Sequence, residues 1–275
     1  MNTCFTVIQD KYYSKLRIQI YNKENKMKFL KFMVIATCLL FTASCASDTE
    51  PTYIGDIEVQ DPYEGYNRNV FAFNDAVSDV IIHPIAKGYR SALPQPVRTG
   101  VRNGLRTLRS PVNLGNQVLQ GDVEGAGNVL TRTAINVMLG LGVIDFAGHE
   151  GIDYEAEDFG QTLAVWGVDH GPYLVVPLIG PSSLRDYFGY IVDGLADPLR
   201  WYLLNINEDG LYYTKLGIEY LDLRESLVDI LEELEESSVD YYAATRSIYY
   251  QRRQALIEDR GRGNASTVPA FPDYD

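Results

Sequence analysis

One segment of the chain is apolar on nearly every side when it is drawn as a helix, and this limits the folds that the chain can adopt. It runs from Glu124 to Gly148 with the sequence EGAGNVLTRTAINVMLGLGVIDFAG. Its polar side chains Asn128, Arg132 and Asn136 are spaced by four residues, so they form one narrow stripe. Such a helix is either buried in a large core or in contact with lipid, and the arginine indicates a face that lines a polar cavity. An ordinary core helix remains the alternative.

A second segment carries four arginines beside an apolar edge. It reads LPQPVRTGVRNGLRTLRSP over residues 93–111. Its apolar stripe and its basic stripe are one residue apart, which is about 100° around a helix. The basic stripe consists of Arg98, Arg102, Arg106 and Arg109. Such a helix suits a lipid interface, where guanidinium groups contact phosphate headgroups. It suits a protein surface about as well, with the arginines paired to the chain's many carboxylates.

The stretch GPYLVVPLIGPSSLRD, residues 171–186, is apolar in its centre and bracketed by glycine and proline. These residues break helices, and the run is far too short to cross a bilayer. Backbone at membrane depth must satisfy its own hydrogen bonds unless it is buried in protein or lines a wet cavity. The stretch therefore predicts a short irregular Gly/Pro hairpin within a helical protein, and a short strand at Tyr173–Val176 is one interpretation of it.

The N-terminal part of the chain has the layout of a secretory signal. A basic start, an apolar run and small residues lead to Cys45 in the sequence MKFLKFMVIATCLLFTASC, residues 27–45. The TASC end resembles the bacterial lipobox, so we expect residues 27–44 to be a lipoprotein signal peptide and Cys45 to be acylated. We expect residues 1–26 to be a non-native extension before a start at Met27. An ordinary cleaved signal with unmodified Cys45 is the alternative.

The charge of the chain excludes one class of partner. The formal net charge is −13, and residues 1–44 hold seven basic but only two acidic residues, so the rest of the chain is more acidic still. This argues against nucleic acid as a partner. It also argues against electrostatic adhesion to anionic lipid, so a membrane anchor would depend on acyl chains or buried apolar surface, at about 0.8 kcal/mol per buried CH₂.

The remaining patterns are mostly helical, so the sequence predicts an all-α fold in which any sheet is minor. Asp61 is the expected N-cap of a helix that His83-Pro84 breaks. An acidic helix is expected at Ile218–Glu236, followed by a tyrosine-rich helix. Residues 45–60 are expected to form a polar tether, and residues 259–275 a disordered tail.

No pattern of residues indicates catalysis or a bound metal or cofactor. The three histidines, His83, His149 and His170, are far apart in sequence and lack metal-ligand spacing. The serines at Ser182 and Ser183 do not belong to a nucleophile-elbow motif. We therefore expect a protein that is not an enzyme and that needs neither a metal nor a cofactor.

Five stretches together resemble the MlaA, or VacJ, family of outer-membrane lipoproteins. They are residues 61–74, 93–122, 132–148, 159–186 and 249–253, and they occur in the order of the family. The similarity covers about residues 45–258 and assigns residues 61–258 to an MlaA-like helical domain. The sequence departs from the family pattern at Thr42 in the lipobox and at Tyr241, where a proline is usual.

The resemblance implies an architecture and a task. Members are all-α, ring-like arrangements of amphipathic helices, lipid-anchored and embedded in the inner leaflet of the outer membrane of a Gram-negative bacterium, facing the periplasm. They remove mislocalised phospholipid from the outer leaflet through an amphipathic pore and pass it to a periplasmic carrier, MlaC. They are found bound to trimeric porins. We therefore expect phospholipid, a trimeric outer-membrane porin and an MlaC-like carrier as partners.

Two groups of side chains are expected to contact lipid. The group that contacts headgroups consists of Arg98, Arg102, Arg106 and Arg109. The group that lines the lipid path consists of Asn128, Arg132, Asn136, Tyr173, Val175, Val176, Pro177, Leu178 and Ile179. We also hypothesise that the hairpin at 173–181 gates lipid entry. The competing functions are a structural scaffold on porins and an envelope lipid hydrolase.

Overall fold

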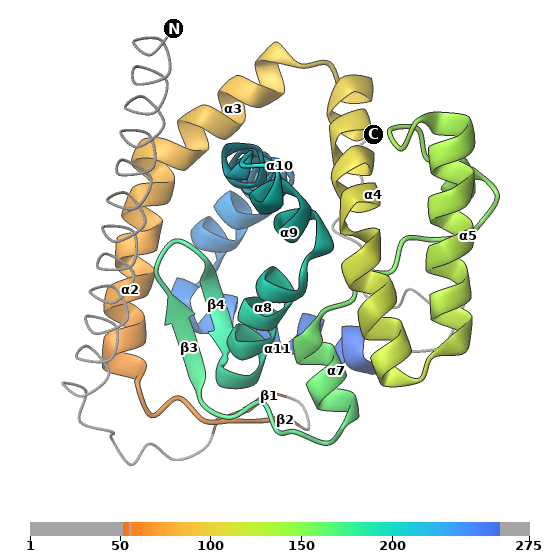
Figure 1. The fold of residues 1–275 in the computed structure, drawn as a ribbon. Coiled ribbons are helices and arrows are strands. Elements are labelled where there is room, and N and C mark those ends of the chain that lie inside the picture. The colour runs from red at the N-terminus through yellow and green to blue at the C-terminus, as the bar shows by residue number, and fades with distance from the viewer. Residues whose placement is uncertain (1–51, 55–56, 259–275) are drawn as a thin grey trace, which may run out of the picture. The chain divides into compact units, whose positions relative to one another are not determined.

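The computed structural model describes residues 52–54 and 57–258, and helices make up most of this part of the chain (Figure 1). The helices are α2 Glu64–Val77, α3 His83–Ala92, α4 Gln95–Gln120, α5 Val123–Gly140, α6 Phe146–His149, α7 Phe159–Val165, α8 Leu184–Ala196, α9 Pro198–Asn205, α10 Asp209–Ser237 and α11 Tyr241–Glu258. The strands are β1 Thr52–Ile54, β2 Ile57–Val59, β3 Tyr173–Val176 and β4 Gly180–Ser183. The predicted signal peptide, Cys45 and the predicted tail lie outside the described residues.

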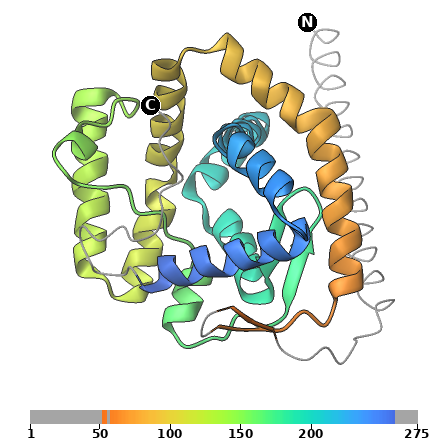
Figure 2. The same ribbon diagram turned by 180° about the vertical axis from the view of Figure 1, so that it is seen from behind.

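Helices α2, α3 and α4 follow one another around α8, α9 and α10, as both ribbon views show (Figures 1 and 2). Helix α11 runs behind them in Figure 1 and contacts α7, α10 and β4. The predicted all-α, ring-like arrangement of helices is therefore confirmed for the described residues, and the strands form only two small hairpins.

The predicted break at His83-Pro84 is wrong, because the chain stays helical from Glu64 to Ala92. A π-helical turn at Ser78–Ile82 joins α2 directly to α3. Pro84 lies in the first turn of α3, where its missing N–H costs no hydrogen bond. The proline is thus accommodated at the point where the hydrogen-bond spacing changes.

Asp61 is not the N-cap that the sequence predicts. The cap position of α2 belongs to Tyr63, which makes no capping hydrogen bond through its side chain. The Asp61 side chain is buried and accepts hydrogen bonds from Arg246 and Tyr242 of α11 and from Asn67. A long-range ion pair therefore replaces the local cap.

Helices α4 and α5 form an antiparallel pair joined by a tight turn. Gly121 ends α4 in the left-handed conformation, with φ of 74°, and Asp122 caps α5 by accepting a hydrogen bond from Gly125 N at 2.9 Å. A Cβ atom on Gly125 would lie 2.6 Å from the Gln117 side chain, so the two helices approach closely here. The turn and the glycine fix α5 against α4.

The Gly/Pro stretch forms a hairpin, as predicted, but a regular one. Strands β3 and β4 pair antiparallel in the register Tyr173↔Ser183 to Val176↔Gly180. The chain before α2 also contains a short antiparallel pair, β1 and β2, within the range predicted as a polar tether. Val59 of β2 is buried in the hydrophobic core with Tyr173, Val175 and the α11 tyrosines, so the end of that range packs against the domain.

Helices α7 and α8 cross at two glycines, Gly160 and Gly189. A Cβ atom on Gly189 would lie 2.2 Å from the backbone N of Gly160 and 2.7 Å from its Cα. Contact at this distance leaves no room for any side chain. The crossing brings α8, which follows the hairpin directly, against the loop that enters α7.

We predict that Gly189→Ala destabilises the protein by about 1–3 kcal/mol or more, because the methyl group must push backbone atoms apart. Gly194→Ala is the matched control, since it lies in the same helix and has no atom within 4 Å of its added Cβ. That control should be neutral or stabilising by up to about 1 kcal/mol through helix propensity. Unfolding of the detergent-extracted chain measures both, and equal stability of the two variants would refute the close crossing.

Candidate functional site

The β3–β4 hairpin has a buried base and an exposed tip. Tyr173, Leu174 and Val175 are buried, and Val176 is half-buried. Pro177, Leu178 and Ile179 of the turn are exposed. The turn itself uses left-handed backbone, with φ of 65° at Leu178 and 107° at Gly180. The residues predicted to line a lipid path at 173–179 therefore divide into a core half and an exposed apolar half.

Two asparagines of α2 bind the free backbone edge of β3. The Asn67 side chain donates to Tyr173 O at 3.0 Å and accepts from Val175 N at 2.9 Å. The Asn74 side chain donates to Val176 O at 3.0 Å and accepts from Leu178 N at 2.7 Å. Each side-chain amide thus makes the backbone hydrogen bonds that a neighbouring strand would otherwise make with β3.

The spacing of the two asparagines matches the strand. Seven helical residues rise about 10 Å, and three strand residues span about the same distance. Asn67 is fully buried, whereas Asn74 is half-buried and lies nearer the tip. The hairpin is therefore fixed at its base by an inaccessible amide and near its tip by a more accessible one.

Below the base of the hairpin, Tyr173 packs among tyrosines of α11. Its ring centroid lies 6.0 Å from Tyr242, 6.0 Å from Tyr249 and 5.9 Å from Tyr250. Burial raises the pKa of the Tyr173 hydroxyl above its ordinary value, and the charge of Asp61 raises it further. These phenols stay neutral at any physiological pH, so the base of the hairpin is held by packing and hydrogen bonds.

The far end of the hairpin leads into a network of charged side chains from three helices. Ser183 caps α8 by accepting from Asp186 N at 3.2 Å. Arg253 of α11 contacts Asp158 through two hydrogen bonds of 2.6 Å and Asp186 at 2.8 Å. Burial alone would raise the pKa of Asp158, but the hydrogen bonds and charge of Arg253 outweigh it and hold that pKa low. The entry to α8 is thereby tied to α7 and α11.

Three of the four α4 arginines pair with carboxylates of α10. Arg98 binds Glu225, Arg102 binds Asp222 at 2.9 Å, and Arg109 lies 3.6 Å from Glu219. Glu225 is 2% exposed and also accepts from Arg90 of α3 at 2.7 Å. These pairs match the second interpretation of the arginine stripe, in which the helix packs on the acidic part of the chain. Headgroup contact by these side chains stays a prediction.

The fourth arginine, Arg106, lies in a polar pocket between α4 and α5. Its guanidinium stacks on the Tyr154 ring with a distance of 4.8 Å to the centroid. Asn128, Arg132 and Asn136 of α5 line the same pocket. The predicted polar stripe of α5 therefore does face a polar cavity, although the cavity volume of about 20 Å³ leaves room for little more than one water molecule.

Two members of the α5 stripe also hold the loop that follows the helix. Arg132 binds Asp145 and the backbone oxygen of Ile152, and Asn136 donates to Asp145 at 2.9 Å. Asn136 also accepts from Ala147 N at 2.9 Å. These contacts give Arg132 and Asn136 a structural role, which leaves Asn128 as the stripe residue with the fewest such contacts.

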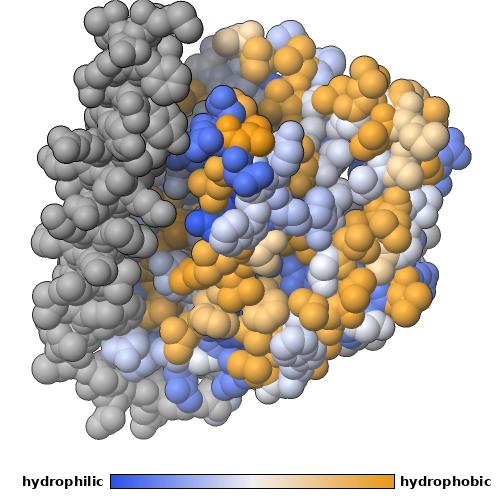
Figure 3. Space-filling model, viewed as in Figure 1, coloured by the Kyte–Doolittle hydropathy of each residue, from blue (hydrophilic) through white to orange (hydrophobic). Residues whose placement is uncertain are grey.

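Polar and charged residues outnumber hydrophobic residues among the buried side chains of the described chain. Conversely, many large hydrophobic side chains are exposed. On α5 and the turn after it they include Val123 at 84%, Met138 at 79% and Leu141 at 87%. Figure 3 shows this apolar surface in orange over the right of the view, where α5 lies. Patches of this extent mark surfaces that meet something other than water.

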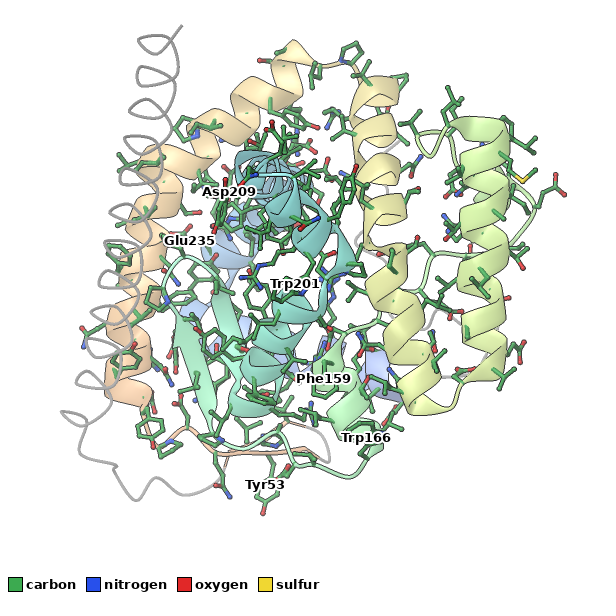
Figure 4. All side chains as sticks on the ribbon, viewed as in Figure 1. Tyr53, Phe159, Trp166, Trp201, Asp209 and Glu235 are labelled. Carbon is green, nitrogen blue, oxygen red and sulfur yellow. The ribbon has the colours of Figure 1, made fainter. Side chains whose placement is uncertain are left out.

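A second set of exposed apolar side chains lies at the end of α7 and on α8 and α9. Trp166 and Trp201 are more than half exposed, and Figure 4 labels both; Trp166 directly follows α7, and Trp201 belongs to α9. Phe188 and Leu195 of α8 are also more than half exposed. Tryptophan at an exposed position beside aliphatic side chains is typical of a membrane–water interface.

Within the described part of the chain, the closest contacts of the buried Glu157 carboxyl group are amides and not cations. Glu157 accepts from Gln120 at 2.7 Å and from Gln117 at 3.5 Å. Burial raises its pKa to about 7, and the neighbouring charges of Asp158 and Glu155 add to the shift against the opposing hydrogen bond of Gln120. The group therefore titrates close to neutral pH.

Several of these residues were missed by the sequence analysis. Asn67 and Asn74 are polar positions seven residues apart in a helix with an apolar stripe, which is the only local signal of a shared partner. Glu225 and Glu157 lie in segments so rich in acidic residues that nothing distinguishes the buried carboxylates from the solvated ones. Their burial follows from tertiary contacts.

In the described residues, no group of three or more His, Cys, Asp or Glu side chains is placed to hold a metal ion. In residues 52–54 and 57–258, no helix combines the length and the apolar character that crossing a membrane requires. The fold and the site together define a helical protein with a polar interior and an outer surface suited to an apolar environment.

The chain belongs to the MlaA lipoprotein family. The model of that family, described as MlaA lipoprotein, matches residues 59–256. The chain is 33% identical over 236 residues to the intermembrane phospholipid transport system lipoprotein MlaA of Escherichia coli, covering 84% of this chain and 89% of that protein. It is 30% identical to the protein of that name in Haemophilus influenzae, covering 84% and 92% of the two chains.

An uncharacterised protein of Rickettsia felis is 34% identical over 206 residues, covering 74% of this chain and 80% of that protein. A solved chain described under "Structural basis for maintenance of bacterial outer membrane lipid asymmetry" matches with a TM-score of 0.64 and 32% identity. The match covers 72% of this chain and 99% of the solved chain. The family and the fold are thus shown by independent comparisons.

We predict that the free energy of unfolding falls as the pH rises from about 5 to 8. The pKa of Glu157 rises from 4.5 in the unfolded chain to about 7 in the folded protein, so the folded state binds more protons between these two pH values. The proton on Glu157 stabilises the folded state fully below pH 4.5, and this stabilisation is lost above pH 7. The loss amounts to at most about 3 kcal/mol of the free energy of unfolding. Glu157→Gln should flatten this part of the profile, whereas the exposed control Glu236→Gln should not. Thermal unfolding at several pH values measures the difference, and parallel profiles for wild type and Glu157→Gln would contradict the assignment.

Proposed function

We propose that this protein is a lipid-anchored lipoprotein of the Gram-negative outer membrane that removes mislocalised phospholipid from the outer leaflet. In this proposal lipid passes along an amphipathic path to a periplasmic carrier, which maintains the lipid asymmetry of the membrane. The family and the names of the similar proteins support the phospholipid-transport assignment. Anchoring through acylated Cys45 and association with a trimeric porin and an MlaC-like carrier come from the family resemblance.

The structural observation that best supports this function is the reversed distribution of polar and apolar side chains. An apolar exterior on α5, α8 and α9 offers contact with acyl chains, while the buried amides and ion pairs offer a polar interior. A protein with this surface needs no helix long enough to cross the bilayer in order to sit within one leaflet. This arrangement suits binding of an amphipathic molecule such as a phospholipid, which has a polar headgroup and apolar acyl chains.

Mass spectrometry of lipids that co-purify with the detergent-extracted protein tests the proposal. Intact phospholipid is the expected result. A porin complex without phospholipid would favour the scaffold function instead. Lipid breakdown products formed by the purified protein, and lost in a serine- or metal-dependent way, would favour the hydrolase. The same relatives are named as transport lipoproteins, which supports a protein that does not catalyse a covalent reaction.

Within this function, we propose that the hairpin tip controls the entry of lipid. The tip exposes Pro177, Leu178 and Ile179, and its only backbone anchor on α2 that is not fully buried is Asn74. Movement of the tip requires the loss of the two Asn74 hydrogen bonds but leaves the Asn67 contacts intact. The geometry thus separates a fixed base from a tip that can open.

We predict that Asn74→Ala frees the tip, admits lipid more readily and so lowers the amount of phospholipid in the outer leaflet of cells that depend on this protein. Loss of the two hydrogen bonds, each about 1 kcal/mol, should speed hydrogen exchange of the Leu178 amide by about tenfold or more. Asn69→Ala is the control, because Asn69 lies on the same helix but, among the described residues, its side chain donates only to Gly65 O. If both variants keep normal asymmetry while Leu178 exchanges faster in Asn74→Ala, the gate is refuted and transport itself is untouched.

A further inference from the structure

The turn that follows α5 exposes a row of apolar side chains. It comprises residues 141–144 and joins α5 to α6. Leu141 is 87% exposed, and Val143 and Ile144 are about half exposed. Met138, in the last turn of α5, extends the same exposed set. Both ribbon views place α5 at the outer edge of the described part of the chain (Figures 1 and 2).

Leu141 has a backbone conformation that leucine rarely adopts. Its φ is 52° and its ψ is 25°, which is the left-handed region, and it forms the C-cap of α5. Glycine or asparagine is usual at such a cap, because a Cβ atom crowds the neighbouring carbonyl oxygen there. The protein thus holds a large apolar side chain outward at a conformational cost. Because that side chain is exposed, packing within the described residues does not offset the cost.

Polar side chains of α4 satisfy the backbone of the turn. Thr107 Oγ1 donates to Gly142 O at 2.9 Å, and Asn103 Nδ2 donates to Val143 O at 3.2 Å. The N–H groups of residues 142–144 donate to carbonyl oxygens of α5 at 2.8, 2.9 and 3.1 Å. A turn in water can leave its carbonyl groups to the solvent, whereas irregular backbone in hydrocarbon needs partners within the protein. These groups of the turn meet the condition for contact with hydrocarbon.

The stretch from residue 125 to residue 144 presents no charge to the outside. Its only charged residue is Arg132, and it contains no aromatic residue. The Arg132 side chain is buried and pairs with Asp145, so this charge is directed inward. Surfaces that bind another protein combine aromatic and arginine side chains with a polar rim. Acyl chains carry no charge and form no hydrogen bonds, so they match this aliphatic surface better.

We propose that the turn at residues 141–144 inserts into the acyl-chain region of the bilayer, with Leu141 as its leading side chain. The inference rests on the proposed function, in which the protein lies within one leaflet of the outer membrane. It adds an insertion element that is separate from the proposed lipid anchor at Cys45 and from the hairpin tip. The hydrogen bonds from α4 hold the turn in its outward conformation, so insertion requires no rearrangement of it.

Depth-dependent quenching of a fluorescent label tests the insertion. Leu141→Cys is labelled with an environment-sensitive fluorophore in the full chain and reconstituted into phosphatidylethanolamine–phosphatidylglycerol vesicles that contain no other protein. Wild type treated in the same way gives the background from its own cysteines. A nitroxide in the acyl chains should quench the label at least about twofold more strongly than a nitroxide on the headgroup, because the two lie at different depths of a bilayer whose hydrocarbon core is about 30 Å thick.

Val239→Cys is the matched control. Val239 is also a fully exposed aliphatic residue in a turn between two helices, but its neighbours Glu235, Glu236 and Asp240 are acidic. The headgroup nitroxide should quench its label at least as strongly as the acyl-chain nitroxide does. No preference for the acyl-chain nitroxide at position 141, or the same preference at positions 141 and 239, overturns the insertion.

Leu141→Asn separates insertion from a structural role of the turn. Asparagine suits left-handed backbone, so the unfolding temperature in detergent should equal or exceed that of wild type. A label at Met138→Cys should lose about half or more of its acyl-chain quenching in this variant, because a polar amide resists entry into hydrocarbon. Leu141→Met, which keeps an apolar side chain of similar volume, should retain the quenching. Unchanged quenching in Leu141→Asn overturns the proposal.

The outcomes distinguish the insertion from the proposed function. Intact phospholipid that co-purifies with the protein, while the label at position 141 shows no acyl-chain preference, overturns the insertion and leaves the function standing. Quenching from the acyl chains in a protein that retains no phospholipid overturns the function and leaves the insertion standing. A label that is shielded only after another outer-membrane protein is added assigns the turn to a protein contact, which also overturns the insertion.

Discussion

The carboxylate of Asp61 holds together three parts of the protein that are far apart in sequence. It accepts from Arg246 Nη1 at 2.6 Å and from Asn67 Nδ2 at 2.8 Å, and also from the Tyr242 hydroxyl. Because the Asn67 amide also binds the backbone of β3, Asp61 fixes the orientation of the group that holds the hairpin. Removing one partner of such a buried pair leaves an uncompensated charge, which costs about 3–5 kcal/mol. Helices α2 and α11 and the hairpin therefore share one ion pair.

Ion pairs also form many of the contacts that α3 and α4 make with α10. Glu225 accepts from Arg90 and Arg98 where a soluble helical protein would usually place aliphatic side chains. Directional ion pairs leave the hydrophobic side chains free to occupy the outside of the fold. The acidic net charge of the chain is thus partly internal, and the surface that remains is more apolar than the composition indicates.

The sequence predicted those elements whose cause is local. Periodicity predicted α5 and its polar stripe, and the Gly/Pro pattern predicted the hairpin, because both follow from neighbouring residues. Asp61 was assigned to a cap because a capping pattern contains no trace of Arg246, which lies 185 residues further on. Pro84 was read as a break because a π-helical turn has no clear sequence signal. Likewise, the pairing of Arg98 and the burial of Glu157 depend on distant helices, so no local pattern could supply them.

The π-helical turn at Ser78–Ile82 has a consequence for how the chain can change over time. Such a turn contains one residue more than the α-helical path and closes its hydrogen bonds around the extra residue. Loss of a single residue here would therefore restore a continuous α-helix and leave the faces of α3 nearly unchanged. The same loss from the regular part of α2 would rotate α3 by about 100°. Lys87 and Arg90 would then point away from Glu232 and Glu225 of α10. The π-helical turn is thus a position at which the chain can lose a residue while the ion pairs that hold α3 to α10 stay in place.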